Sequence, residues 1–66
     1  MLTFSSYPKI AVDPNTCEGK PHIVGTRITV SAILAYLAGG MDIEDVSKSF
    51  PQISKEDIQQ ALAFTS

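Results

Sequence analysis

The spacing of the hydrophobic positions changes near residue 30, and this change divides the chain into two halves. Residues 9–12 alternate between polar and apolar side chains, and the turn-forming residues 13–15 follow them. This alternation predicts a short strand, which we expect at the edge of a sheet. We therefore expect a single domain, with a β element in residues 1–30 and three short helices in residues 31–66.

Residues 21–30 carry the pattern of a β-hairpin. Gly25 and Thr26 separate two extended runs, and glycine at the first central position is typical of a two-residue turn. Counting outward from this turn pairs Ile23 with Ile28. Because side chains alternate along a strand, one face is expected to carry Pro21, Ile23, Ile28 and Val30, and the outward face His22, Val24, Arg27 and Thr29.

The second half has helical spacing and predicts three helices. The first is expected to be capped by Ser31 and to stop at Gly39-Gly40, which accept positive φ. Asp42 is expected to cap the second helix and Ser54 the third. Their buried stripes are predicted to be Ile33, Leu34 and Leu37, then Ile43, Val46 and Phe50, then Ile58, Ala61 and Leu62.

The chain has 66 residues, of which 44% are hydrophobic, and a single cysteine, Cys17. A core of this size rarely contributes more than about 3–5 kcal/mol, and a lone cysteine provides neither an intrachain disulfide nor a zinc pair. We therefore expect a homo-oligomer, a dimer or larger, with no metal and no cofactor. No apolar run approaches the length of a membrane span, and residues 1–10 do not have the pattern of a secretory signal, so we expect a cytoplasmic protein.

Charge is distributed unevenly between the two halves. Residues 1–33 have three basic and two acidic side chains, whereas residues 34–66 have two basic and five acidic ones. The net charge of −2 and the pI near 5.0 are far from the basic balance of an autonomous nucleic-acid-binding protein. We expect DNA binding by the isolated chain to be weak, local or dependent on a partner.

Several motifs in a fixed order extend from Ile10 to Phe64. They are Asp13-Pro14 through Cys17, Gly19-Lys20-Pro21, the run from Gly25 to Val30, Gly39-Gly40, Phe50-Pro51, the run from Ser54 to Ile58, and Ala61-Leu62. Together they closely resemble a small bacterial and archaeal family, domain of unknown function 433, whose members are described as antitoxins related to the VapB45-like group. The chain departs from the family pattern at Glu18, where the family usually has glycine, and at Val24, where it often has a basic residue.

This resemblance implies a mainly α fold. It would be a three-helix, helix-turn-helix-like bundle of the homeodomain or winged-helix kind, preceded by a short strand and a β-hairpin. The resemblance also implies a partner, because genes of this family commonly adjoin a gene for a PIN-like nuclease toxin. We therefore expect a non-enzymatic binding module, an antitoxin that binds and neutralises such a toxin, with operator binding as a secondary activity. The alternative is a homodimeric helix-turn-helix DNA-binding transcriptional regulator without a toxin partner.

Arg27, the only arginine in the chain, is the residue that we expect to make a specific partner contact. From the outward face of the hairpin, its planar guanidinium would bind a carboxylate or phosphate through two parallel hydrogen bonds. The alternative is an intramolecular ion pair with Asp13 or Glu18, and the sequence leaves both interpretations open. The other residues expected to bind the partner are Lys20, His22 and Thr29.

Four positions are expected to define the backbone rather than to contact a ligand: Gly19, Pro21, Gly25 and Thr26. A nucleophile, a base and an orienting group could be assembled from Cys17, His22 and Asp13, but a chain of this length has little bulk for the required cleft. We therefore do not expect an enzyme, and we interpret His22 as an exposed strand residue and Cys17 as an inert thiol.

The third helix is where a helix-turn-helix unit would contact bases. The candidate nucleic-acid contacts are Lys55, Gln59 and Gln60, since the glutamines lie off the buried stripe and can pair with adenine. Glu56 and Asp57 occupy the first turn, where phosphates would approach. Their acidity favours a solvated helix face instead.

Overall fold

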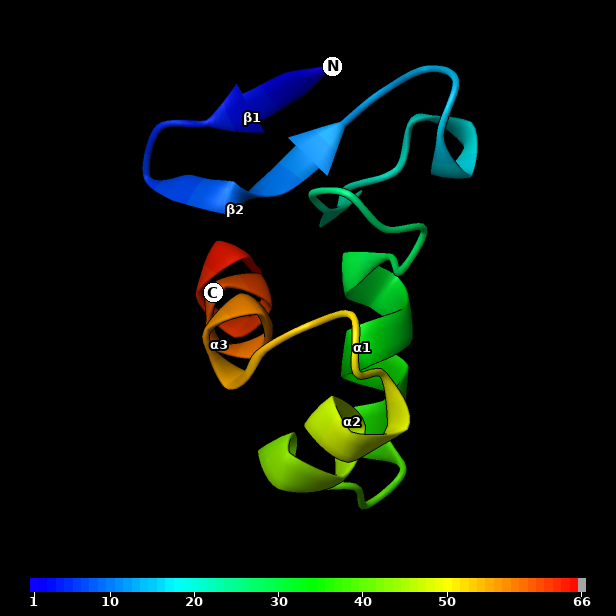
Figure 1. Cartoon of the computed structure of the whole chain (residues 1–66), viewed down its shortest axis with the longest axis vertical. Coiled ribbons are helices and arrows are strands. Elements are labelled where there is room, and N and C mark those ends of the chain that lie inside the picture. Colours follow the sequence, from blue (N-terminus) through cyan, green and yellow to red (C-terminus); the bar gives the residue numbers. More distant parts are fainter. Residues whose placement is uncertain (66) are drawn as a thin grey trace.

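A three-stranded antiparallel sheet lies at one end of the molecule, and three helices extend from it (Figure 1). The structure is a computed structural model and describes residues 1–65. The strands are β1 (Leu2–Phe4), β2 (Tyr7–Val12) and β3 (His22–Ile23), with the 3-10 turn η1 (Cys17–Gly19) before β3; the helices are α1 (Val30–Ala38), α2 (Ile43–Ser49) and α3 (Lys55–Phe64). No helix within residues 1–65 has the length and hydropathy needed to cross a membrane.

The sheet makes the fold α+β, so the expected mainly α bundle of the helix-turn-helix kind is wrong. Strand β1 was not predicted, although Leu2, Thr3 and Phe4 alternate between apolar and polar side chains. The sheet is an integral part of the core, because Ile10 of β2 and Ile23 of β3 are 0% and 2% exposed. Helix α3 therefore packs against strand β2, and the three helices pack against one another.

Strand β2 occupies the middle of the sheet, whose strand order is β1-β2-β3. The expectation of an edge strand over residues 9–12 is therefore wrong, because β1 folds back onto β2 through a turn at residues 5–6. Ala11 of β2 pairs with Thr3 on one side and with His22 on the other, and it is fully buried. The exposed edge of the sheet is β1.

The pairing within residues 21–30 has the predicted register. The Ile23 amide donates a hydrogen bond to the Ile28 carbonyl oxygen at 3.0 Å, and His22 forms a bridge with Thr29. The outward position predicted for His22 is wrong, since the residue is 2% exposed. Its Nδ1 donates to the Lys20 carbonyl oxygen at 3.0 Å, which holds the ring against the loop that precedes β3.

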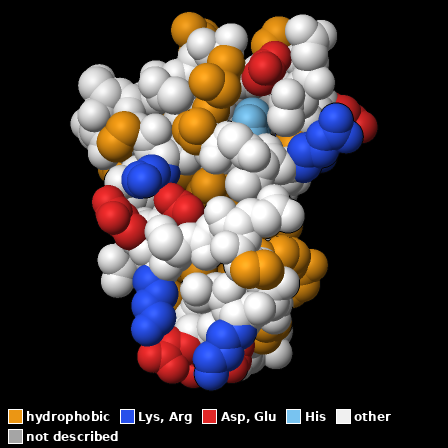
Figure 2. All heavy atoms as spheres, viewed as in Figure 1, with side chains coloured by type: hydrophobic (Ala, Val, Ile, Leu, Met, Phe, Trp, Pro, Cys, Tyr) orange, Lys and Arg blue, Asp and Glu red, His pale blue; other side chains and the backbone are white. Residues whose placement is uncertain are grey.

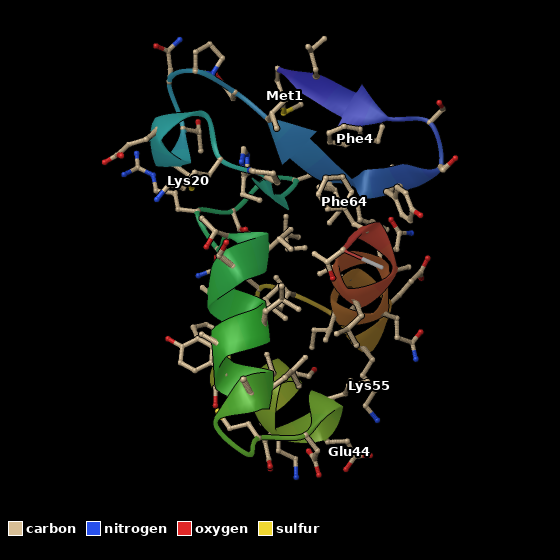
Figure 3. The ribbon with its side chains drawn as sticks, turned by 180° about the vertical axis from the view of Figure 1, so that it is seen from behind. Met1, Phe4, Lys20, Glu44, Lys55 and Phe64 are labelled. Carbon is tan, nitrogen blue, oxygen red and sulfur yellow. The ribbon has the colours of Figure 1, made fainter. Side chains whose placement is uncertain are left out.

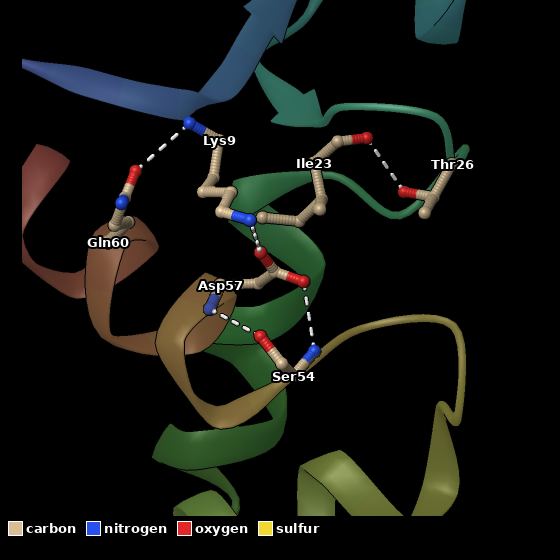
Figure 4. A network of polar contacts seen from close by, with 6 residues as sticks. All are labelled: Lys9, Ile23, Thr26, Ser54, Asp57 and Gln60. Carbon is tan, nitrogen blue, oxygen red and sulfur yellow. Dashed lines mark hydrogen bonds and ion pairs between the residues drawn. The ribbon is translucent and has the colours of Figure 1, made fainter.

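The turn of this hairpin differs from the predicted one by one residue. Val24 and Gly25 occupy its central positions, because the Thr26 amide donates to the Ile23 carbonyl oxygen at 3.0 Å. The Thr26 hydroxyl also donates to this carbonyl at 2.9 Å (Figure 4). The same hydroxyl oxygen accepts a hydrogen bond from the Ile28 amide at 3.1 Å. These side-chain hydrogen bonds replace the main-chain hydrogen bonds expected between Val24 and Arg27. The loop of the hairpin therefore includes residues 24–27.

Capping residues set the boundaries of the helices. Helix α1 begins two residues earlier than predicted because Thr29, not Ser31, caps it. The Thr29 hydroxyl oxygen accepts a hydrogen bond from an amide of the first turn at 3.0 Å. Asp42 and Ser54 cap α2 and α3 as predicted, each in a reciprocal capping box. Helix α1 ends as predicted before Gly39-Gly40.

The hydrophobic core draws on the sheet, all three helices and the segment between α2 and α3. Its buried members are Ile10, Ile23, Val30, Ile33, Val46, Ile53, Ile58 and Ala61. Each helix contributes buried side chains from its predicted stripe, and other stripe residues, such as Leu34 and Phe50, are half-buried against this core. The amphipathic pattern therefore identified the inward faces of the helices correctly.

Polar and aromatic contacts fasten α3 to the sheet. The Lys9 amide of β2 donates to Gln60 Oε1 at 3.0 Å, and Lys9 Nζ lies 4.0 Å from Asp57 Oδ1 (Figure 4). At the end of α3, the Phe64 ring lies 4.8 Å from the ring of Phe4 and 5.6 Å from that of Tyr7, measured between centroids. These contacts fix the sheet, and therefore the loops beside β3, relative to the helices.

Candidate partner-binding site

Two loops meet beside β3, and together they form the candidate site. The first, residues 16–20, contains η1, and the second, residues 24–27, is the hairpin loop. The thiol of Cys17 in the first loop donates a hydrogen bond to the carbonyl oxygen of Arg27 in the second, with a sulfur–oxygen distance of 3.3 Å. The backbone of Arg27 is therefore tied to a neighbouring loop as well as to its own turn.

The backbone of the first loop is left-handed at three consecutive residues. The φ angles of Cys17, Glu18 and Gly19 are 54°, 56° and 79°. Two main-chain hydrogen bonds close this loop, from Gly19 to the Thr16 carbonyl at 3.1 Å and from Lys20 to the Cys17 carbonyl at 3.0 Å. A left-handed conformation costs a non-glycine residue about 1–2 kcal/mol. The loop thus stores strain at its two non-glycine residues, Cys17 and Glu18.

The side chain of Arg27 is exposed, and no hydrogen bond or ion pair joins it to any other residue within 1–65. The intramolecular alternative, a pair with Asp13 or Glu18, does not form among these residues. The Asp13 carboxylate instead accepts a hydrogen bond from the Asn15 amide at 2.9 Å. The site therefore combines a restrained backbone with an unengaged guanidinium.

The other residues predicted to bind a partner divide into two groups. Lys20 is exposed and lies above the N-terminal end of α1, on the side away from α3 (Figure 3). Thr29 is half-buried and its hydroxyl caps α1, while His22 is buried in the sheet. In this conformation only Arg27 and Lys20 present their side chains to a partner.

The four positions predicted to define the backbone lie in the two loops or beside them. Gly19 and Gly25 have φ of +79° and +78°, which favours glycine. The Pro21 carbonyl oxygen accepts from the Val30 amide at 3.0 Å and joins the hairpin to the start of α1. Together with the hydrogen bonds of Thr26, these contacts support the structural interpretation of all four.

Two of the three candidate nucleic-acid contacts on α3 are engaged within the chain. Lys55 Nζ lies 3.0 Å from Glu44 Oε1 of α2, and Gln60 Oε1 accepts the Lys9 amide (Figures 3 and 4). Gln59 is exposed. Within residues 1–65, Gln59 is therefore the one side chain of the predicted three that has no hydrogen-bond or ion-pair partner.

The cysteine, histidine and aspartate considered as a catalytic group are each held by other partners. Cys17 bonds to the Arg27 carbonyl, His22 to the Lys20 carbonyl, and Asp13 to the amide of Asn15. Among the residues described, 1–65, no pocket opens and no three metal-ligating side chains cluster together.

A second surface, the outer face of α1, was not singled out from the sequence. Tyr36 on this face is 41% exposed, and its ring centroid lies 5.2 Å from that of Phe50. Helix α1 carries no charged side chain, whereas α2 and α3 each carry three. That absence of charge is the signal in the sequence that could have identified this face.

Comparison with known proteins decides the family. The family model described as "Protein of unknown function (DUF433)" matches residues 10–65. The chain belongs to DUF433. The match includes both loops of the candidate site and all three helices, and it begins within β2, after β1.

Two relatives of this DUF433 chain are longer proteins. The uncharacterized protein Rv2308 of Mycobacterium tuberculosis is 30% identical over 60 residues, which are 91% of this chain and 25% of Rv2308. The crystal structure of a DUF433 member from Anabaena variabilis matches with a TM-score of 0.81 at 28% identity, over 85% of this chain and 55% of that one. The chain thus spans a quarter of one relative and about half of the other.

Proposed function

We propose that this DUF433 chain is a non-enzymatic binding module that recognises a protein partner through Arg27. The observation that carries the proposal is the exposed guanidinium, which has no partner among residues 1–65, on a backbone held by the Cys17 thiol. A restrained backbone reduces the entropy lost when the side chain binds. Arginine is also enriched among the residues that dominate binding energies at protein interfaces.

The partner that we propose is a PIN-like nuclease toxin, which makes this chain an antitoxin of the VapB45-like kind in the cytoplasm. The resemblance to that group supports this choice. A nuclease that uses a divalent metal ion holds the ion with Asp and Glu side chains. A guanidinium matches a carboxylate through two parallel hydrogen bonds, so Arg27 can pair with such a carboxylate and block the groove. Lys20, exposed nearby, adds a second positive charge.

The test uses the full chain and the purified PIN-like protein encoded beside its gene. Calorimetry would measure the dissociation constant for the wild type, Arg27→Ala and Arg27→Lys. We expect Arg27→Ala to raise this constant at least about tenfold, and Arg27→Lys to raise it less, because lysine keeps the charge without the planar geometry. Lys48→Ala removes another exposed positive charge, on α2, and serves as the matched control that leaves binding unchanged.

A second measurement follows cleavage of RNA by the toxin. The wild-type chain is expected to inhibit cleavage at equimolar concentration, and Arg27→Ala is expected to restore it. Two results would overturn the proposal: a neighbouring protein that does not bind the wild type, or an Arg27→Ala variant that binds and inhibits as the wild type does.

A further inference from the structure

The outer face of α1 lacks the charged residues that solvent-facing helices normally carry. Its exposed positions are Ser31, Ala35, Tyr36 and Ala38. In Figure 2, hydrophobic side chains gather at the edge of the molecule beside α1, and no charged side chain interrupts them in that view. This surface, which we call the α1 face, is uncharged along the whole helix.

The α1 face is shaped for close contact with another helix. The ring of Tyr36 packs against that of Phe50 in a tilted arrangement, at an interplanar angle of 43°, which restrains this exposed side chain. Three of the four exposed positions carry small side chains, and small side chains allow two helix axes to approach to about 8 Å. A partner helix can therefore lie directly along α1.

Opposite charges lie at the two ends of α1. Arg27 and Lys20 are exposed at its N-terminal end and outnumber the one exposed carboxylate there, Glu18. Asp42 and Asp45 are exposed at the start of α2, beyond the C-terminal end of α1, and outnumber the exposed Lys48. The connection to α2 is short and is bonded back to α1, since the Met41 amide donates to the Tyr36 carbonyl oxygen at 3.2 Å. The acidic end is therefore fixed close to the last turn of α1.

We propose that a second copy of this chain packs on the α1 face, with the two α1 helices antiparallel about a two-fold axis. This arrangement places the basic end of each copy beside the acidic end of the other, so the charges that flank the face become complementary. In the antiparallel direction the partly positive N-terminus of each α1 also lies beside the partly negative C-terminus of the other, which is favourable. A parallel arrangement would instead place like charges together. The net charge at each end of α1 thus favours a second copy as the occupant and the antiparallel direction for it.

The first test disrupts the centre of the face. Sedimentation equilibrium would compare the wild type with Ala35→Arg and with Ala63→Arg, which adds the same charge at an exposed alanine of α3. The wild type and Ala63→Arg are expected to be dimeric. Ala35→Arg is expected to weaken dimerisation about a hundredfold or more, because it buries an unpaired charge. A monomeric wild type, or an Ala35→Arg dimer as tight as the wild type, would overturn the proposal.

The second test uses cross-linking and does not depend on how a charged variant folds. Cys17→Ser provides the cysteine-free background. In that background, Ser31→Cys chains mixed with Ala38→Cys chains are expected to form a mixed disulfide, because antiparallel helices bring these positions together. Each variant alone is expected to cross-link poorly. Efficient cross-linking of each variant with itself would contradict the antiparallel arrangement, and the absence of any cross-link would contradict the α1 face.

This inference and the proposed function can fail separately. Arg27→Ala removes the toxin contact and also one of the charges that flank the dimer interface, whereas Ala35→Arg disrupts the dimer and leaves Arg27 in place. If the dimer uses the α1 face, Ala35→Arg is expected to remain able to bind the toxin as a monomer. Capture of a toxin on the α1 face in place of a second copy would abolish toxin binding by Ala35→Arg and would overturn the inference.

Discussion

The Cys17 thiol donates a hydrogen bond to the carbonyl oxygen of Arg27 across 3.3 Å, and this contact joins two loops ten residues apart in sequence. It restrains the backbone of Arg27 without involving the guanidinium. The residue thus has a structural part, its carbonyl, and an unengaged part, its side chain. Substitutions at Arg27 can therefore remove the guanidinium and keep the hydrogen bond that joins the two loops.

The first prediction concerns the stability of the free chain. Arg27→Ala is expected to change the free energy of unfolding by less than about 0.5 kcal/mol, because the exposed side chain has no partner within residues 1–65. Urea denaturation followed by circular dichroism measures this quantity. A loss of more than about 1 kcal/mol would show that the guanidinium makes an intramolecular contact after all.

The second prediction concerns the strain at Glu18, whose φ is 56°. Glu18→Gly is expected to stabilise the chain by about 0.5–1 kcal/mol, because glycine adopts this conformation without steric cost. The melting temperature should rise by about 2–6 °C. Glu56→Gly, at an exposed position in the first turn of α3, is the matched control and should lower it. A lower melting temperature for Glu18→Gly would contradict the left-handed loop.

The third prediction compares two glycines, one in the hairpin turn and one at the end of α1. Gly25 has a φ of +78° and open space where a Cβ would be added, so Gly25→Ala is expected to cost about 1 kcal/mol through backbone strain alone. Gly39 has a φ of −79°, and Gly39→Ala should be less destabilising. Thermal unfolding of both variants checks this order. Equal stability of the two would contradict the turn centred on Val24 and Gly25.

The fourth prediction separates the two glutamines of α3. Gln60→Ala is expected to lower the free energy of unfolding by about 0.5–1.5 kcal/mol, because the Lys9 amide loses its acceptor. Gln59→Ala, at the neighbouring exposed position, should be close to neutral. Hydrogen exchange at the Lys9 amide should accelerate in Gln60→Ala and stay unchanged in Gln59→Ala. Unchanged exchange there would show that Gln60 does not fasten α3 to the sheet.

Much of the local structure could be predicted from the sequence. Asp42 and Ser54 were identified as caps because a capping box involves residues only three positions apart. The pairing of Ile23 with Ile28 was also correct, since a short loop restricts the register. The exact turn was missed because the Thr26 side chain replaces a main-chain pair, and no hydrophobic pattern encodes that substitution.

The candidate site was predictable only in part. Arg27 was identified because it is the only arginine in the chain and lies beside a tight turn. The choice between a partner contact and an intramolecular ion pair could not be made without knowing where Asp13 and Glu18 lie. The prediction for His22 failed because strand alternation assigns a face and does not say what covers that face. The loop that precedes β3 folds against the ring, and its Lys20 carbonyl bonds to it.

The sequence by itself determined the family, the caps of α2 and α3 and the inward faces of the helices. The caps and the faces depend on side chains within a few residues of one another, and the family match follows the order of residues 10–65. Only the tertiary structure decided the sheet order, the burial of His22 and the unengaged state of Arg27. These features depend on contacts between distant segments, such as the bond from the Lys9 amide to Gln60, 51 positions away. Local propensity carries no information about such contacts, since they form only when separate elements bury their apolar surfaces together.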